Sequence, residues 1–252
     1  MIGLFLLLPI QLIMPATAQG QATVLNSNGY LNSVGLYHVV GEVQNSGSSA
    51  IMAVLITATL YTSNNTRLGT SSSQTMIAIL ESGRKAPFDI TVIDFMQSAK
   101  THHYELTVTY EQSASLPSNL EIVSSSKSVD AAGFLHISGK IKNSGSGIAH
   151  ETKVVATFYD SGGKVVDAAM SYCDPTDIAV GAKLAAFEII TLEKARVTLV
   201  DSYTLNAQSV EYSTVEYGVV PEFAAAFLVL PMIVLLALIV TRRKAIPIQV
   251  EA

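Results

Sequence analysis

Cysteine is almost absent from this sequence. Cys173 is the one thiol in 252 residues, so one chain cannot form an internal disulfide and its fold has to be stabilised by apolar cores. The thiol lies in the loop-like stretch SYCDPTD. We expect an incidental, partly buried thiol there, with a functional thiol as the alternative.

Positive charge is also scarce. The chain has 15 Lys and Arg against 20 Asp and Glu, a net charge of −5. Its one basic cluster is RRK near the C-terminus, so the basic face that nucleic acids require is missing and we expect no nucleic-acid partner. P-loop, HExxH, GxSxG and dinucleotide motifs are missing too. An S-x-x-K match at Ser124–Lys127 falls in the low-complexity run SSSKS. We therefore expect no catalysis and no cofactor.

Long apolar runs occur only at the two ends. From Phe223 to Val240 no residue is charged, and about 18 helical residues at roughly 1.5 Å each can cross a hydrocarbon core. This predicts a transmembrane helix at 222–241. The basic cluster behind it should stay inside the cell, which makes 242–252 a cytoplasmic tail and 213–221 a short extracellular stalk.

The amino end resembles a secretory signal. It is apolar from Ile2 to Met14 and then shows an A-x-A pattern ending at Ala18, which predicts a signal peptide at 1–18 that is cleaved after Ala18. No Lys or Arg precedes the apolar run, so an uncleaved N-terminal anchor stays open. With the signal cleaved, we expect a single-pass protein of the cell membrane with its bulk outside the cell.

The middle of the chain is a duplication. Shifting the sequence by 98 positions aligns LYHVVGEVQNSGS with FLHISGKIKNSGS. A repeat of nearly 100 residues has the size of a domain, so we expect domain 1 at 22–115 and domain 2 at 116–212. After one inserted residue the alignment continues with Phe88 on Phe187 and Tyr104 on Tyr203.

Each copy has the period-two pattern of strands. Apolar and polar residues alternate through LHISGKIK, which predicts one buried and one solvated face. The stretches at 64–66 and 160–163 occupy equivalent hairpin positions. Without any helical periodicity, about seven strands per copy predict an all-β fold: two tandem immunoglobulin-like β-sandwich domains plus the C-terminal transmembrane helix.

These residues resemble a known family. The pattern G-[EK]-[VI]-x-N-S-G-S, then A-T-[LF]-Y and a Phe-[DE]-Ile strand, is similar to FxLYD domains, immunoglobulin-like modules of prokaryotic envelope proteins. The resemblance covers both copies and implies no catalytic residues. The chain departs from the naming motif, since Ala58 and Ala156 replace its Phe and Thr62 replaces its Asp.

The C-terminal end resembles a PEF-CTERM sorting signal of archaea. That resemblance implies cleavage by an archaeosortase near the motif and re-anchoring through a lipid. Because the tail after the basic cluster is longer than usual, a plain single-pass anchor remains the alternative. The residues that carry the resemblance are Pro221, Glu222, Phe223, Arg242, Arg243 and Lys244.

Few residues are candidates for a site. His38 and His136 occupy equivalent positions on the predicted polar face, and two histidines are too few for a zinc or copper site. We expect both to face solvent and predict no metal site. Asp160, Asp174 and Asp177 lack a calcium-loop pattern and are expected to be turn residues. Asn64 heads the one N-x-S/T sequon, at an outward hairpin tip, and is a predicted glycosylation site.

These observations predict a cell-surface anchored, non-catalytic envelope protein. Its two β-sandwich modules would make structural or adhesive contacts with other envelope proteins or glycans. The alternative is an accessory extracellular-domain subunit of a membrane complex.

Overall fold

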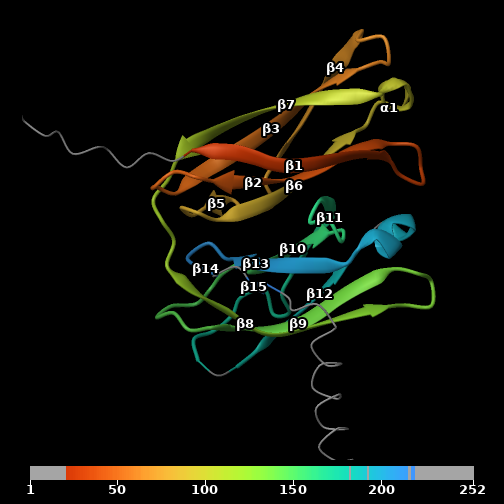
Figure 1. The fold of residues 1–252 in the computed structure, drawn as a ribbon. Coiled ribbons are helices and arrows are strands. Elements are labelled where there is room, and N and C mark those ends of the chain that lie inside the picture. Colours follow the sequence, from red (N-terminus) through yellow and green to blue (C-terminus); the bar gives the residue numbers. More distant parts are fainter. Residues whose placement is uncertain (1–20, 182, 192, 215–216, 219–252) are drawn as a thin grey trace, which may run out of the picture.

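The fold is all-β, with sheets arranged as in a sandwich (Figure 1). The computed structural model describes residues 21–181, 183–191, 193–214 and 217–218. The predicted signal peptide with Ala18, the transmembrane helix, the cytoplasmic tail and all six sorting-signal residues lie outside these ranges. Among the residues within them, no helix has the length and apolarity needed to span a membrane.

The first half of the chain forms two sheets that face each other across a core. One sheet has the order β1-β2-β6 and the other β4-β3-β5, with β7 also paired to β3. Fully buried side chains such as Phe88, Ile56 and Leu60 fill the space between them. The strands are β1 (Ala22–Leu31), β2 (Tyr37–Asn45), β3 (Ile51–Tyr61), β4 (Arg67–Gln74), β5 (Ile79–Leu80), β6 (Lys85–Val92) and β7 (His103–Gln112).

The second half repeats this arrangement, but its strands form one connected sheet. Its strands follow the continuous order β11-β10-β13-β14-β8-β9-β12, because β14 pairs with β13 and, in parallel, with β8. A second core surrounds Phe158 and Ile137. The strands are β8 (Ser118–Val129), β9 (Leu135–Asn143), β10 (Lys153–Tyr159), β11 (Val165–Tyr172), β12 (Ala185–Ile190), β13 (Ser202–Gln208), β14 (Ser213–Thr214) and β15 (Tyr217–Gly218).

Residues that recur in both copies make equivalent contacts within each half. Asn45 donates from Nδ2 to the carbonyls of Ser49 and Leu80 at 2.7 and 2.9 Å, and Asn143 makes the corresponding pair of bonds in the second half. At Gly41 an added Cβ would lie 2.5 Å from Phe88 Cζ. Glycine is therefore required where the phenyl ring crosses the strand, and Gly139 under Phe187 repeats the arrangement.

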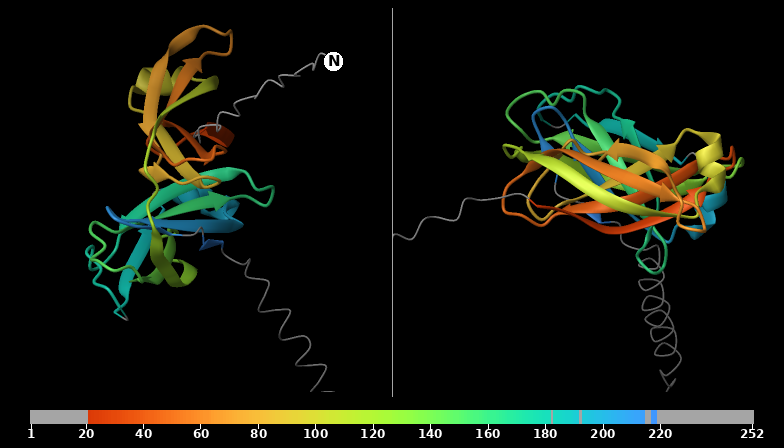
Figure 2. Two further views of the ribbon diagram at one scale, coloured as in Figure 1. Left: turned by 90° about the vertical axis from the view of Figure 1, so that its left-hand side faces the viewer. Right: turned by 90° about the horizontal axis from the view of Figure 1, so that it is seen from above.

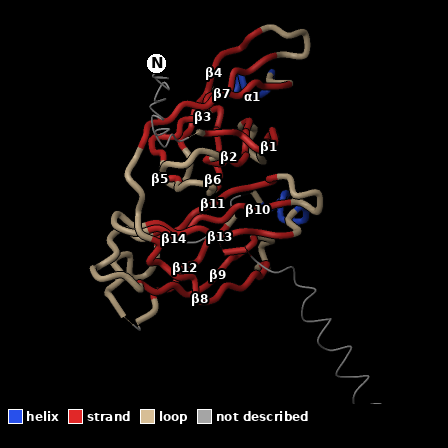
Figure 3. Tube along the Cα trace, turned by 60° about the vertical axis from the view of Figure 1, so that its left-hand side comes forward, coloured by secondary structure: helices blue, strands red, loops and turns tan. Residues whose placement is uncertain are grey.

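The two halves also contain short helices at two equivalent places, which the sequence pattern did not predict. A short α-helix, α1 (Phe95–Lys100), follows β6, and a 3₁₀ helix, η1 (Lys194–Leu199), follows β12 (Figure 3). Asp94 caps α1 by accepting hydrogen bonds from the backbone N–H groups of Met96 and Gln97. Six residues are too few to show a helical period in the sequence. Asp94, a residue type that favours the N-cap position, is the one local sign of a helix start.

The face of β2 that contains His38 and Glu42 was predicted to be exposed to solvent, and this prediction is wrong. Glu42 is 2% exposed and Val40 is fully buried, because β11 of the second half lies across the outer face of the sheet β1-β2-β6 (Figure 2). Glu42 Oε1 accepts a hydrogen bond from Tyr159 Oη at 2.5 Å. The alternation of apolar and polar residues correctly predicted a strand with two different faces. It could not indicate that the second half of the chain covers one of them.

Candidate functional site: the cleft between the halves

The two halves meet in a joint with paired polar groups. Val155, on β10, belongs to the apolar core of the first half. Gln208 accepts from the N–H groups of Ala78 and Ile79 and donates to the Ile79 carbonyl at 2.9 Å. Because apolar and polar contacts are combined here, the halves are held in one arrangement.

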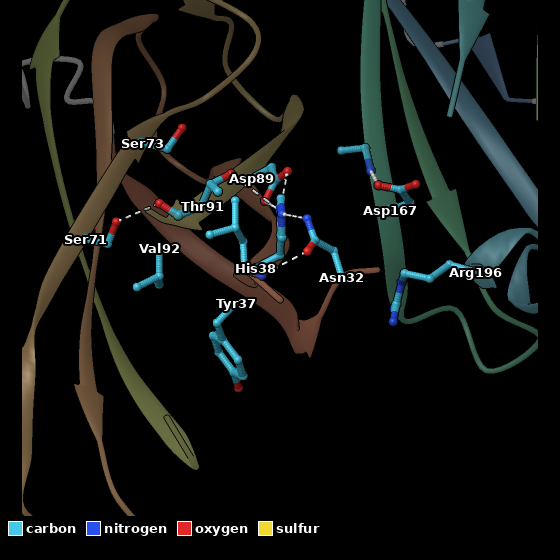
Figure 4. A network of polar contacts seen from close by, with 12 residues as sticks. Asn32, Tyr37, His38, Ser71, Ser73, Asp89, Thr91, Val92, Asp167 and Arg196 are labelled. Carbon is cyan, nitrogen blue, oxygen red and sulfur yellow. Dashed lines mark hydrogen bonds and ion pairs between the residues drawn. The ribbon is translucent and has the colours of Figure 1, made fainter. Parts of the chain in front are cut away.

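Beside this joint lies a cleft of about 510 Å³ between β1, β2 and β6 on one side and β11 on the other. Figure 4 shows its polar side chains, with the His38 group on the first half and Asp167 and Arg196 on the second. The lining residues with ionisable or donor side chains are Tyr30, Asn32, Ser33, His38, Asp89, Asp167 and Glu193.

His38 is held between an amide and a carboxylate. Asn32 Oδ1 accepts from the N–H groups of Val34 and Leu36, so Asn32 Nδ2 must be the atom that faces His38 Nε2 at 3.0 Å. Nε2 then accepts and Nδ1 donates to Asp89 at 2.9 Å. This arrangement describes a neutral imidazole. The side chain is 14% exposed, so our expectation of a solvent-facing His38 is wrong, and the covering β11 explains it.

Asp167 faces this group from β11. The residue is 7% exposed, and its Oδ1 accepts from the N–H of Ala168 at 2.8 Å. Burial raises the pKa of the Asp167 carboxyl to about 6, and the negative charge of Asp89 adds to that rise. Asp89 and Asp167 thus both face the cleft, and Asp167 ionises only near neutral pH.

A ring stack closes the side of the cleft. The Arg196 guanidinium lies 3.7 Å from the Tyr30 ring centroid, and Tyr30 stacks on His38 with centroids 5.3 Å apart. Burial raises the pKa of Tyr30, with the charge of Asp167 contributing. Arg196 Nε donates to the Val166 carbonyl, while Arg196 Nη2 is buried with no partner among the described residues.

Glu193 joins the two halves at the mouth of the cleft. Its Oε2 accepts from the backbone N–H of Ser33 at 2.7 Å, and this bond lowers the pKa of Glu193. The loop after β1 is thereby tied to the segment before η1.

The second half contains the counterpart of the His38 group. Asp130 replaces Asn32, and His136 bonds to Glu188 at 2.9 Å and to Asp130 at 3.2 Å. Glu188 first, and Asp130 second, raise the pKa of His136. The His136 side chain is 19% exposed, so it too is more covered than we expected, here by its own acidic partners.

The structure places the other predicted residues apart from the cleft. Asn64 is exposed in the turn between β3 and β4, and its Oδ1 accepts from the Thr66 hydroxyl at 3.0 Å. Cys173 is buried, and burial raises its pKa to about 12, so its thiol stays protonated. Asp160 and Asp177 bind backbone N–H groups of turns. Within the described ranges no three His, Cys, Asp or Glu side chains gather as a metal site would require.

Sequence reasoning missed most residues of the cleft. The duplication contained a signal for one pair, since Asp89 and Glu188 align beside the recurring Phe. It contained none for Asp167 or Arg196, because Gly69 and Gln97 occupy the aligned positions. The cleft thus combines residues that recur, such as His38, with residues in which the two copies differ, such as Asp167.

Comparison with known proteins gives structural matches only. No protein-family model matches the chain, and no curated protein matches it in sequence. Among solved structures it is similar to exo-chitosanase CsxA from Amycolatopsis orientalis, at 14% identity and a TM-score of 0.29 over 77% of this chain and 26% of that one. It is also similar to red sea bream transglutaminase (11%, TM-score 0.25, 80% and 30%). A third match is Bacteroides uniformis β-glucuronidase 2 (10%, TM-score 0.25, 76% and 28%).

These matches correct one expectation. We expected a protein without catalysis, and the matched structures named above are enzymes, two of them glycosidases. The chain spans less than a third of their length. At these identities and TM-scores the matches assign no activity or substrate to this chain.

Proposed function

We propose that the chain is a cell-surface anchored envelope protein that presents two immunoglobulin-like modules of the FxLYD type to partners outside the cell. In this proposal residues 1–18 direct export, and a helix at 222–241 anchors the chain or serves as a PEF-CTERM signal for an archaeosortase. The partners are other envelope proteins or glycans. The near-absence of cysteine suits such a prokaryotic origin.

The observation that carries the proposal is the joint between the halves. Linked domains are expected to move relative to each other unless their interface is well packed. Here Val155 enters the core of the neighbouring half, and the buried Glu42 is bonded to Tyr159. A pair fixed in this way holds the exposed faces and loops of its two halves at a constant spacing from each other, which suits presentation to a partner.

The location can be tested by protease treatment of intact cells. With antibodies against the region from Leu36 to Tyr203, which stays in the mature chain, we expect added protease to digest this region before lysis. A cytoplasmic protein in the same cells should survive. Protection of this region until lysis would refute the proposal.

Asn64 offers a second test of the outward location. We expect Asn64→Gln to remove a glycan mass from the peptide that contains it. Asn65→Gly keeps the sequon and suits the positive φ of 61° at that position, so it should keep the glycan. A wild-type peptide whose mass is that of its amino acids alone would contradict glycosylation at this site.

An exposed apolar edge favours the accessory subunit as the second candidate function. Val34, Ile93, Phe95 and Met96 are 60–81% exposed, and an added Cβ at Gly35 would lie 4.0 Å from Phe95, which joins the loop after β1 to α1. Exposed apolar clusters mark protein contacts. In mild detergent we expect a stoichiometric partner that Ile93→Ser with Phe95→Ser releases. Val210→Ser, at a similarly exposed position (61%), should retain it. A lone chain in the wild-type preparation would exclude this candidate.

A further inference from the structure

The cleft between the halves has the build of a ligand site. Its volume of about 510 Å³ lies in the range of small-molecule pockets, which combine apolar walls with a few polar groups. The apolar part is formed by Val34, Met76, Ala169, Met170 and Ile190. The charged groups that face it are Asp89, Asp167 and Glu193, with Arg196 behind Tyr30.

Asp167 is a largely buried carboxyl in the wall of the cleft, where Arg196 offsets only part of its unfavourable surroundings. The residue is 7% exposed and lines the cleft. Oδ1 accepts from the N–H of Ala168, and Oδ2 has no hydrogen bond to any described residue. Its one hydrogen bond leaves Oδ2 open to the cleft, and a carboxylate that is largely removed from water gains from a further polar partner. Asp89 lies across the same cleft, so the charge that would satisfy Asp167 would also reduce the repulsion between the two.

The remaining polar groups of the cleft favour a ligand that donates hydrogen bonds. His38 uses Nδ1 to donate to Asp89 and Nε2 to accept from Asn32, so it has no N–H left for a ligand. Glu193 accepts from Ser33. Three carboxylates and one guanidinium leave two net negative charges around a cavity that presents mainly acceptors.

Two observations narrow the kind of cation. Within the described residues no group of three or more His, Cys, Asp or Glu could hold a metal ion, which favours an organic cation. Tyr30 already stacks with Arg196 and with His38, so its ring does not form an open aromatic cage for a quaternary ammonium. A primary ammonium, with three N–H donors, fits paired carboxylates better.

We propose that the cleft binds a primary ammonium that carries an apolar body, with the ammonium between Asp89 and Asp167 and the body along Met170. The raised pKa of Asp167 agrees with this assignment, because burial and then the nearby charge of Asp89 disfavour its ionised form, which a bound cation would favour. The proposal does not depend on the cellular location of the chain.

Calorimetric titration of the full chain in mild detergent tests the proposal, with phenethylammonium as the probe. At pH 8 we expect one site per chain. Asp167→Asn keeps the shape and should weaken binding by at least about tenfold, the loss typical of a charged hydrogen-bond partner. Glu111→Gln changes an exposed acid on β7 and should bind as the wild type does. Binding of Asp167→Asn within twofold of the wild type would overturn the proposal.

Two analogues of the probe, and a comparison of affinity at pH 8 and pH 5, complete the test. We expect 2-phenylethanol, which is neutral, and the N-trimethylated probe, which cannot donate, each to bind at least about tenfold more weakly than the probe. Equal binding of either would overturn the assignment. Because Asp167 has a pKa of about 6, affinity should fall about tenfold from pH 8 to pH 5. A flat pH profile would contradict a role for its charge.

Discussion

Replacing Asp167 by Asn should stabilise the protein at high pH and not at low pH. The carboxyl has a pKa of about 6 in the folded chain against an ordinary value of 3.8. A raised carboxyl pKa means that the folded state binds the proton more tightly than the unfolded state. Stability therefore falls as pH rises from about 4 to about 6 and is constant above that.

The size of the effect follows from this difference in pKa. About two pKa units correspond to about 3 kcal/mol of folding free energy lost above pH 6. Asn removes the charge and keeps an oxygen that can accept from the N–H of Ala168. For a folded region of about 200 residues we expect a melting temperature higher by about 6–12 °C at pH 8.

Scanning calorimetry at pH 4 and pH 8 checks this prediction, with Glu111→Gln as the matched control. The control should melt as the wild type does at both values. A gain for Asp167→Asn that is the same at pH 4 and pH 8, or no gain at pH 8, would refute the account of a buried, ionised Asp167.

Three further predictions concern the two halves. Gly41→Ala should destabilise the protein by about 1–3 kcal/mol or more, since the new Cβ would lie 2.5 Å from Phe88 Cζ; Gly162→Ala, in an exposed turn, should change the denaturant midpoint little. Phe158→Ala should cost about 3–5 kcal/mol in a denaturant titration, because its fully buried ring leaves a cavity; a loss below about 1 kcal/mol would contradict that burial. Glu188→Gln should lower the pKa of His136 in an NMR titration, as it removes the main cause of the raised value; an unchanged midpoint would contradict the pairing.

The strands and their repetition were predictable because they follow from local chemistry. The period-two alternation around Ile137 and the glycine-containing turns indicate the strands directly, and the structure confirms an all-β fold. The matched Asn45 and Asn143 have the same partners in both halves, as a duplication requires.

The cleft was not predictable because it depends on how the halves meet. The pattern around His38 and Glu42 is that of a solvated strand, and only β11 of the other half buries it. Asp167 stands in a sequence that reads as an ordinary strand, VVDAAMSY. Its pKa and its orientation toward Asp89 arise from contacts between segments far apart in the chain, which no local pattern records.

The two halves dock as one unit and thereby form the cleft. The relative placement of the halves can be measured with two spin labels in a Cys173→Ala background. The labels are attached at Thr70→Cys on β4 and Ser128→Cys on β8, both exposed positions. Pulsed electron paramagnetic resonance then gives the distribution of distances between the two labels. The account predicts one narrow distance distribution for the full chain in detergent. A broad distribution, as freely moving domains would give, would contradict it.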